Sequence, residues 1–163
     1  MSAAAAAPLV SVVIPAHDSA RYLDECLGSV FAQQGEFELQ VIVVDDASSD
    51  GTARVARAHD KVELIRFDEN RGPSAARNAG IAAARGEFVA FLDSDDRWPE
   101  GKLAAQLAVL QVEPAAALVF GGLGVANPRS LLDNAPLRDL LSRAINFNAI
   151  QESIDRGYLG AVA

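Results

Sequence analysis

The feature that most constrains the fold is a short apolar segment, residues 88–92, that stops abruptly at acidic side chains. Asp93, Asp95 and Asp96 follow this segment directly. A hydrophobic run of this length is typical of a strand that is buried on both faces in a parallel sheet. Because open α/β sheets bind ligands outside the carboxyl ends of their strands, the three acids predict a ligand site. A solvated acidic turn remains the alternative when these acids are considered alone.

Other short apolar segments alternate with stretches that have helical periodicity. Leu23, Leu27 and Val30, for example, are spaced so that they form one apolar stripe of a helix. Strands that alternate with helices imply βαβ units, so we expect an α/β fold with a Rossmann-like, mostly parallel sheet, flanking helices and a helical C-terminal tail. The predicted strands cover residues 9–15, 39–44, 62–67, 88–92 and 115–120, and later helices cover residues 73–85, before Gly86, and a segment that begins at Pro99.

The chain of 163 residues has the length of one domain with a sizeable core. We expect a flexible leader over residues 1–8, an α/β domain over residues 9–122 and a helical tail of uncertain origin over residues 123–163. Apolar stripes in that tail would be exposed if it stood alone, so we expect it to dock on the domain or to mediate self-association. Residues 159–163 look like the beginning of a strand, which suggests an incomplete chain.

The charge and the cysteine content exclude several classes of protein. A net charge of −8 argues against binding to nucleic acids or anionic membranes, since phosphate groups are bound there by clustered Lys and Arg. Cys26 is the only cysteine, so an internal disulfide is impossible and a reducing compartment is favoured. No apolar stretch approaches the roughly 20 residues that cross a bilayer. We therefore expect a cytoplasmic protein without a transmembrane segment.

The spacing of the acids distinguishes between kinds of metal site. A calcium loop of the EF-hand type fits poorly, because Trp98 and Ala104 stand where that loop needs Gly and Glu. Mg²⁺ instead takes one or two carboxylates together with the phosphate oxygens of a substrate. Asp93 and Asp95, at i and i+2 beyond a strand end, suit this arrangement. The sequence thus predicts a divalent cation that holds the diphosphate of a sugar nucleotide.

Two further groups of charged residues have both a functional and a structural interpretation. Asp45 and Asp46 end a predicted strand, where an acid can accept a hydrogen bond from a ribose hydroxyl or cap the next helix. Arg71 and Arg77 can contact a diphosphate through their forked donors, or they can be ordinary surface residues. A dehydrogenase or P-loop site is excluded, since the chain has neither G-x-G-x-x-G after the first strand nor a Walker A sequence.

Four segments, residues 12–18, 41–52, 70–81 and 86–98, together resemble the family 2 glycosyltransferases, which have the GT-A fold. They occur in that family's order and at its spacing, over roughly residues 9–120. The resemblance implies a nucleotide-diphosphate sugar as donor (a UDP-sugar or another NDP-sugar), a Mg²⁺ or Mn²⁺ ion, and inverting transfer to an unknown acceptor. A bridging cation would neutralise the charge that develops on the departing nucleoside diphosphate.

The resemblance also implies roles for individual residues. It places the loop of Ala16, His17 and Asp18 against the base and the ribose, although His17 and Asp18 replace the Tyr-Asn that is usual there. Asp95, together with Asp96, would bind the metal. The other implied nucleotide contacts are Asp46 at the base or ribose, Arg77 near the nucleotide, and Asp93 at the ribose or donor sugar.

A catalytic base is not identified in this sequence. In the family, an acid of the acceptor half takes the proton from the acceptor hydroxyl, and nothing after Phe120 resembles that half. Residues 123–163 are instead similar to an internal segment of patatin-like phospholipases, without the G-x-S-x-G nucleophile turn. Two functions therefore stay open. The family favours an enzyme, a glycosyltransferase, and the alternative is a non-catalytic nucleotide-sugar-binding module that lacks the acceptor half.

Overall fold

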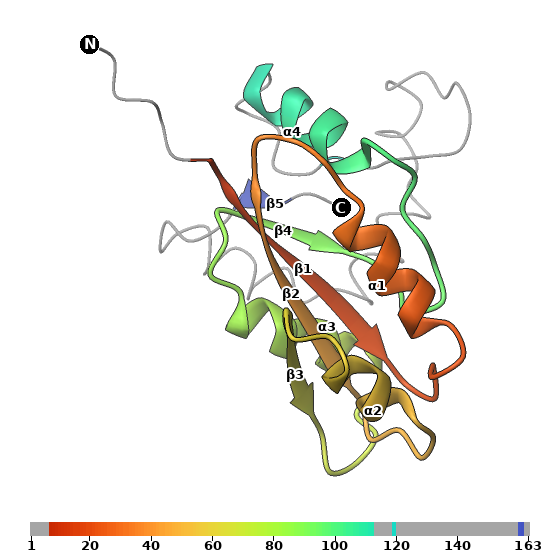
Figure 1. Cartoon of the computed structure of the whole chain (residues 1–163). Helices are drawn as coiled ribbons and strands as arrows, with labels where there is room; N and C mark the ends of the chain where they lie inside the picture. The colour runs from red at the N-terminus through yellow and green to blue at the C-terminus, as the bar shows by residue number, and fades with distance from the viewer. Residues whose placement is uncertain (1–6, 113–118, 120–159, 162–163) are drawn as a thin grey trace, which may run out of the picture.

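The computed structural model describes residues 7–112, 119 and 160–161, and it shows a twisted parallel sheet flanked by helices (Figure 1). The β-branched segments of the sequence form the strands, and the segments with helical periodicity form the helices between them. In chain order the described elements are β1 (Leu9–Ala16), α1 (Leu23–Phe31), β2 (Glu38–Asp45), α2 (Thr52–Arg57), β3 (Val62–Arg66), α3 (Pro73–Ala83), β4 (Phe88–Phe91), α4 (Lys102–Val112) and β5 (Gly160–Ala161).

All neighbouring strands of this sheet are parallel, in the order β3-β2-β1-β4-β5. The register pairs Ala16 with Asp45, so the carboxyl ends of β1 and β2 lie at the same edge of the sheet. β4 pairs with the other side of β1, where Phe91 lies opposite Val13. The strand order thus reverses at β1, which is the switch point where open α/β sheets bind ligands. The predicted α/β, Rossmann-like class is confirmed.

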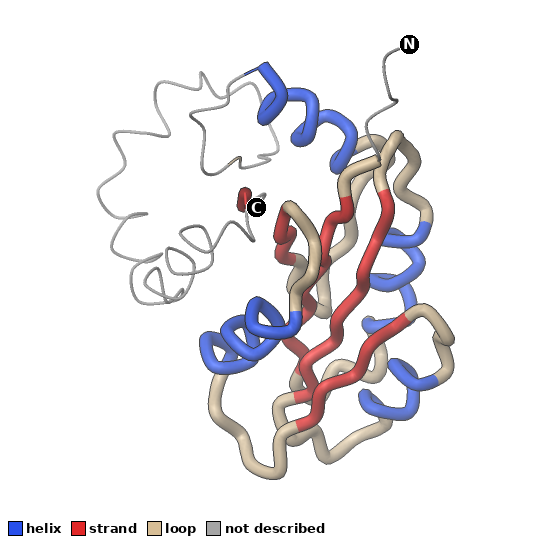
Figure 2. Tube along the Cα trace, turned by 90° about the vertical axis from the view of Figure 1, so that its left-hand side faces the viewer, coloured by secondary structure: helices blue, strands red, loops and turns tan. Residues whose placement is uncertain are grey.

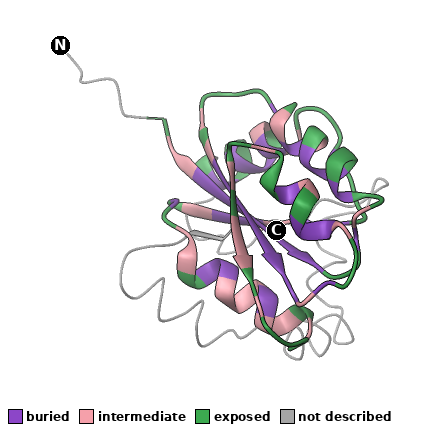
Figure 3. Cartoon of the chain, turned by 60° about the horizontal axis from the view of Figure 1, so that its bottom comes forward, coloured by how far each residue is buried: buried purple, intermediate pink, exposed green. Residues whose placement is uncertain are grey.

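Helices cover both faces of the sheet, so its middle strands are almost completely buried (Figures 2 and 3). Side chains alternate along β1. Val12 and Ile14 belong to the core that includes residues of α1, α2 and α4, whereas Val13 packs with Ile42 and α3 on the other face. β3 is only partly buried, as its alternating sequence predicts for a strand near an edge.

Helix α3 approaches the sheet closely because its inner face consists of very small residues. Ala76 and Gly80 are both buried in this face. A Cβ atom built on Gly80 would overlap Cγ1 of Val13, so no larger residue fits at this position. Pro73 stands in the first turn of α3, where its missing N–H costs no hydrogen bond. The small residues therefore set how near α3 comes to β1.

Two helix boundaries differ from the prediction. Helix α4 begins at Lys102 and not at Pro99, because Gly101 has a φ angle of +73° and so stands outside the helical region. Helix α3 ends at Ala83 and not at residue 85, because Ala84 is already extended. The apolar face of α4 is buried, and it consists of Leu103, Leu107 and Leu110.

Several predictions concern residues outside the described ranges. These are most of the leader, most of the tail, and the strand predicted over residues 115–120, of which only Val119 is described and stands in no strand. Gly160–Ala161 forms β5 beside β4, within the segment predicted to begin a strand. In the part of the chain that the structure describes, no helix is long and apolar enough to span a membrane.

Candidate functional site

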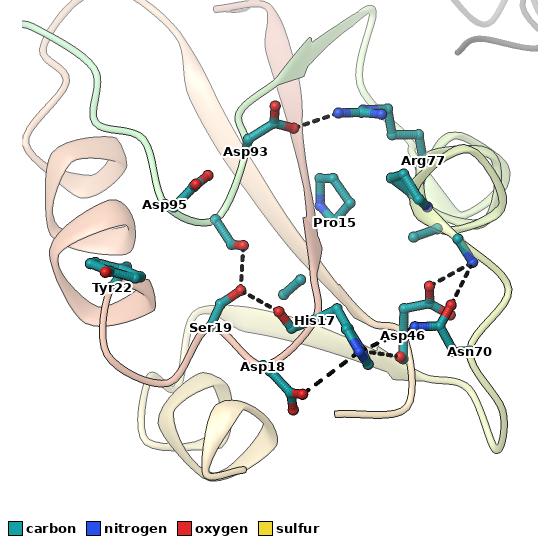
Figure 4. Close-up of a pocket in the computed structure, with 15 residues that line it drawn as sticks. Pro15, His17, Asp18, Ser19, Tyr22, Asp46, Asn70, Arg77, Asp93 and Asp95 are labelled. Carbon is teal, nitrogen blue, oxygen red and sulfur yellow. Dashed lines mark hydrogen bonds and ion pairs between the residues drawn. The ribbon is translucent and has the colours of Figure 1, made fainter. Parts of the chain in front are cut away.

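A cavity of about 480 Å³ opens at the carboxyl ends of β1, β2 and β4 (Figure 4). Its volume lies in the range of small-molecule binding clefts. Four separate segments form its walls: the loops after these three strands and the beginning of α3 with the loop before it. The cavity brings together most of the predicted site residues, and of the candidates only Asp45, Arg71 and Asp96 do not line it. Those that line it are Ala16, His17, Asp18, Asp46, Arg77, Asp93 and Asp95.

His17 lies on the cavity wall with both ring nitrogens in contact with neighbours. Its Nδ1 is 2.7 Å from the backbone oxygen of Asp46, and its Nε2 is 3.2 Å from Nδ2 of Asn70. Because a carbonyl oxygen can only accept, Nδ1 carries the proton, and Nε2 then accepts from the Asn70 amide. The side chain is 44% exposed, so the ring stays accessible to a ligand while its nitrogens fix its orientation.

Asp18 connects the loop after β1 to the turn before α2. Its Oδ1 accepts the backbone N–H groups of Ser49 (2.8 Å) and Asp50 (3.3 Å). These bonds, above all the one from Ser49, hold the pKa of the Asp18 carboxyl below its ordinary value. The backbone of Asp18 is left-handed, with φ at +46°, a conformation that Asp tolerates better than most residues. Asp18 is thus an ionised group that both lines the cavity and orders a neighbouring turn.

The adjacent acids Asp45 and Asp46 differ in their surroundings. Asp45 is completely buried, and its Oδ2 lies 3.3 Å from Nε of Arg66. Asp46 lines the cavity, and its two carboxylate oxygens accept the backbone N–H groups of Arg71 and Gly72, each at 2.7 Å. Oδ1 of Asp45 accepts the backbone N–H of Ser48 (2.9 Å), so Asp45 holds the turn that follows β2 and does not cap α2, which begins at Thr52. Asp46 has lone pairs left for a ligand, because each oxygen accepts only one of these bonds.

Arg77 and Asp93 form an ion pair on the cavity wall, where the Arg77 guanidinium donates to Oδ1 of Asp93 (Figure 4). The Arg77 side chain is only 18% exposed, and the Asp93 side chain is 52% exposed. Arg71 does not line the cavity, and its guanidinium lies over the ring of Phe67. A mostly buried guanidinium that faces a cavity is a strong partner for phosphate oxygens.

The side chains of the loop after β4 alternate in exposure. Ser94 is buried, and its hydroxyl lies 2.7 Å from that of Ser19, whereas Asp93 and Asp95 are exposed. In Figure 4 Asp93 turns to Arg77, and Asp95 lies on the side of the cavity near Tyr22. The Asp95 carboxylate makes no hydrogen bond or ion pair with any residue that the structure describes. Among the acids that line the cavity, Asp95 is therefore the one whose carboxylate is uncommitted, that is, without a hydrogen bond or ion pair to the described residues.

The residues around Asp95 suit a cation that a ligand helps to hold. Within residues 7–112, 119 and 160–161, no group of three or more His, Cys, Asp or Glu side chains could bind a metal by itself. Mg²⁺ commonly takes only one or two carboxylates and completes its shell with substrate phosphates and water, and Mn²⁺ also prefers oxygen ligands. An exposed, uncommitted carboxylate at a cavity of this size fits that role.

A smaller cavity of about 290 Å³ adjoins the first. Tyr22 and Asp95 line both cavities, so the Asp95 carboxylate stands between them. Arg97 and Glu25, which line the second cavity, pair with each other at 3.1 Å.

Sequence reasoning missed four uncharged residues of the site that carry a hydroxyl or an amide, namely Ser19, Tyr22, Asn70 and Ser94. Asn70 and Ser94 lie inside the segments that resemble known proteins, so those segments contained a usable signal. Tyr22 is 45% exposed although it is large and aromatic, but its exposure is visible only in the structure.

Comparison with known proteins gives consistent results. A family model, glycosyl transferase family 2, matches residues 11–151. The succinoglycan biosynthesis protein ExoO of Rhizobium meliloti is 50% identical over 91 residues, which cover 55% of this chain and 26% of ExoO. The structure of S. aureus TarS 1–349 in complex with UDP-GlcNAc matches with a TM-score of 0.63 and 30% identity, covering 77% of this chain and 38% of TarS. The mannosyltransferase PcManGT from Pyrobaculum calidifontis, in complex with GDP-Man and Mn²⁺, matches with a TM-score of 0.57 and 33% identity, covering 63% of this chain and 32% of that protein.

The extent of these matches bears on the domain boundaries. The family match continues to residue 151, into the segment predicted to be a separate tail. The similarity of that segment to patatin-like phospholipases finds no support in these comparisons. The chain spans less than half of the length of the relatives it matches.

Proposed function

The chain belongs to glycosyl transferase family 2, and we propose that it forms the donor-binding part of an inverting glycosyltransferase that uses a nucleotide-diphosphate sugar. One observation carries this proposal. The cavity at the carboxyl ends of β1, β2 and β4 combines the Asp46 carboxylate, the Arg77 guanidinium and the uncommitted Asp95 carboxylate. An acid for hydroxyl groups, a cation for phosphates and a site for a metal are the groups that such a donor requires.

The base and the ribose would lie against the loop after β1. Ala16, His17 and Asp18 form this wall, and His17 offers a ring whose orientation its two nitrogens fix. Asp46 stands beside the ring with unused acceptor capacity for a ribose hydroxyl or a base N–H. These are the residues to which the family resemblance assigns contacts with the base and the ribose, and all of them line the cavity.

The diphosphate would lie between Arg77 and the loop after β4. Arg77 would donate to phosphate oxygens, Asp93 would face the ribose or the donor sugar, and Asp95 would hold the metal. A bound Mg²⁺ or Mn²⁺ ion would neutralise the charge that develops on the leaving nucleoside diphosphate. Asp96 does not line the cavity, so we assign the metal to Asp95 and use Asp96 below as a comparison.

The relatives support the choice of donor class. S. aureus TarS is solved with UDP-GlcNAc, and PcManGT is solved with GDP-Man and Mn²⁺. UDP and GDP are therefore the first nucleotides to test with this chain.

A non-catalytic nucleotide-sugar-binding module is the second candidate. The observation that favours it is that, among the described residues, the cavity is lined entirely by those between Pro15 and Asp95, to which we assign contacts with the donor and none with an acceptor. Both candidates require donor binding, and sugar transfer to an acceptor separates them. The acceptor, a cytoplasmic location and self-association stay predictions.

Replacing Arg77 with methionine is expected to weaken the binding of UDP or GDP, measured by isothermal titration calorimetry with Mn²⁺ present. Met keeps much of the side-chain volume and removes the charge, so a charge-assisted hydrogen bond worth roughly 1.5–3 kcal/mol is lost, which is about a 10- to 100-fold change in Kd. Arg97→Met is the matched control, because Arg97 lies outside the main cavity. A wild-type chain that binds no nucleoside diphosphate, with UDP and GDP tested first, would overturn both candidate functions.

A further inference from the structure

We propose that helix α1 sets the position of Asp95, with Gln33 and Ser29 as positioning residues for the metal site. Neither side chain lines either cavity, so each would act through the loop that carries Asp95. The inference rests on the proposed function, because it concerns the metal-binding role of that carboxylate.

The loop between β4 and α4 has little support of its own. It contains no helix or strand from residue 92 to residue 101. Within this described stretch, only one backbone hydrogen bond joins two residues of the loop, from the Asp96 N–H to the Asp93 oxygen (3.0 Å). The other backbone bonds join its ends to β1 and α4, from the Leu92 N–H to the Val13 oxygen (3.2 Å), from the Lys102 N–H to the Pro99 oxygen (3.4 Å) and from the Ala105 N–H to the Gly101 oxygen (3.0 Å). A segment with so few internal bonds takes its conformation from what it packs against.

Gln33, just beyond the end of α1, holds the second half of this loop. Its side chain is buried, with 7% of the residue exposed. Nε2 donates to the backbone oxygen of Pro99 (2.8 Å), and Oε1 accepts the backbone N–H of Leu103 (3.1 Å). Nε2 also lies 3.3 Å from the backbone oxygen of Ser29, inside α1. One amide therefore connects the helix to both sides of the Gly101 turn that begins α4.

Ser29 and Cys26 contact the loop on the two sides of Asp95. The Ser29 hydroxyl accepts the backbone N–H of Trp98 (3.0 Å) and donates to the backbone oxygen of Cys26 (2.7 Å). The Cys26 thiol lies 3.6 Å from the backbone oxygen of Asp93. Cys26 and Ser29, three residues apart, lie on one side of α1, and Gln33 follows shortly after the helix ends. The loop passes along α1 on its way to α4 (Figure 1).

Asp95 stands between two of these contact points, at Asp93 and Trp98, and its own carboxylate has no partner among the described residues. The position of the Asp95 carboxylate therefore depends on the contacts that its neighbours Asp93 and Trp98 make with α1. Loss of the Gln33 amide would remove the shorter of the two bonds to the Pro99 oxygen, which would keep only the 3.4 Å bond from Lys102. It would also remove the side-chain acceptor of the Leu103 N–H, and both losses favour a rearranged loop. Loss of outer contacts that orient a metal ligand typically costs about 10- to 100-fold in metal affinity.

The test compares Gln33→Leu with Gln34→Leu in the full chain. Gln34 is the exposed neighbour of Gln33, so the same substitution there removes no contact of the loop. The readout is the ratio of the Kd for UDP or GDP without Mn²⁺ to the Kd with Mn²⁺. We expect Gln33→Leu to lower this ratio about tenfold and to leave the metal-free Kd unchanged, whereas Gln34→Leu keeps the wild-type ratio.

Two further measurements separate positioning from a general loss of stability. Trp98 is the only tryptophan of the chain and is buried in the tethered loop, so its quenching by acrylamide should rise in Gln33→Leu and not in Gln34→Leu. Ser29→Ala should lower the Mn²⁺ ratio, and Ser29→Thr, which keeps the hydroxyl, should restore it. A Gln33→Leu chain with a lower melting temperature but with wild-type Mn²⁺ ratio and quenching would overturn the inference. Absence of any Mn²⁺ effect in the wild type would instead overturn the proposed metal site itself.

Discussion

Asp46→Ala is expected to abolish most of the nucleotide affinity of this chain. The Asp46 carboxylate accepts the backbone N–H groups of Arg71 and Gly72, both at 2.7 Å, and so fixes the loop that leads into α3 and Arg77. The Arg71 N–H would be left without a partner, whereas the Gly72 N–H would keep its bond to Oδ1 of Asn70 (3.1 Å). One unpaired N–H costs about 1–3 kcal/mol, so the free energy of unfolding should fall by that amount. Because the same carboxylate lines the cavity, we expect the Kd for UDP or GDP to rise more than tenfold, measured by calorimetry.

Asp68→Ala is the matched control for Asp46→Ala. Asp68 is an acid of the same loop, and its side chain makes no hydrogen bond or ion pair with the described residues. Its loss should change neither the unfolding free energy nor the Kd. Wild-type nucleotide affinity in Asp46→Ala would contradict the assignment of Asp46 to the donor site.

Gly86→Ala is expected to destabilise the chain strongly, although it adds only one methyl group. A Cβ atom on Gly86 would lie 2.6 Å from the backbone oxygen of Leu9 and 2.7 Å from the backbone nitrogen of Ser11. Backbone atoms of a buried strand cannot move aside as a flexible side chain can, so the cost should lie near the upper end of overpacking, about 3 kcal/mol. Urea denaturation followed by Trp98 fluorescence measures this change.

Gly28→Ala is expected to stabilise the chain, in contrast to Gly86→Ala. Gly28 lies inside helix α1, and a Cβ atom there would meet nothing within 4 Å. Alanine should therefore stabilise the chain by about 0.5–1 kcal/mol, because it reduces the conformational freedom of the unfolded state without creating a clash. Equal unfolding free energies for the two variants would show that Gly86 is not held against β1 as described.

The sheet could be predicted from sequence because its strands are short apolar segments that stop at polar residues. The alternation of strands and helices then required parallel strands, and parallel strands bring their carboxyl ends to one edge. For this reason Asp46 and Asp95, which are far apart in the chain, could be expected in one cavity, and both line it. Whether they bind a donor is still a prediction.

Other features depend on distances that a sequence does not contain. Gly86 follows a helix and so resembles a helix stop, yet its small size is needed against β1. Asp95 and Asp96 are equivalent in composition, but only Asp95 lines the cavity, because the direction of each side chain depends on the path of the loop. Gln33 and Gln34 are identical neighbours, and only their burial distinguishes the residue that holds that loop.

The central claim, a nucleoside diphosphate held through a metal at Asp95, is tested most directly by one calorimetric comparison. UDP and GDP are titrated into the wild type, Asp95→Asn and Asp96→Asn, each with and without Mn²⁺. We expect Mn²⁺ to strengthen binding in the wild type and in Asp96→Asn and to have no effect in Asp95→Asn. The same Mn²⁺ effect in Asp95→Asn as in the wild type, or no effect in any of the three, would contradict this account.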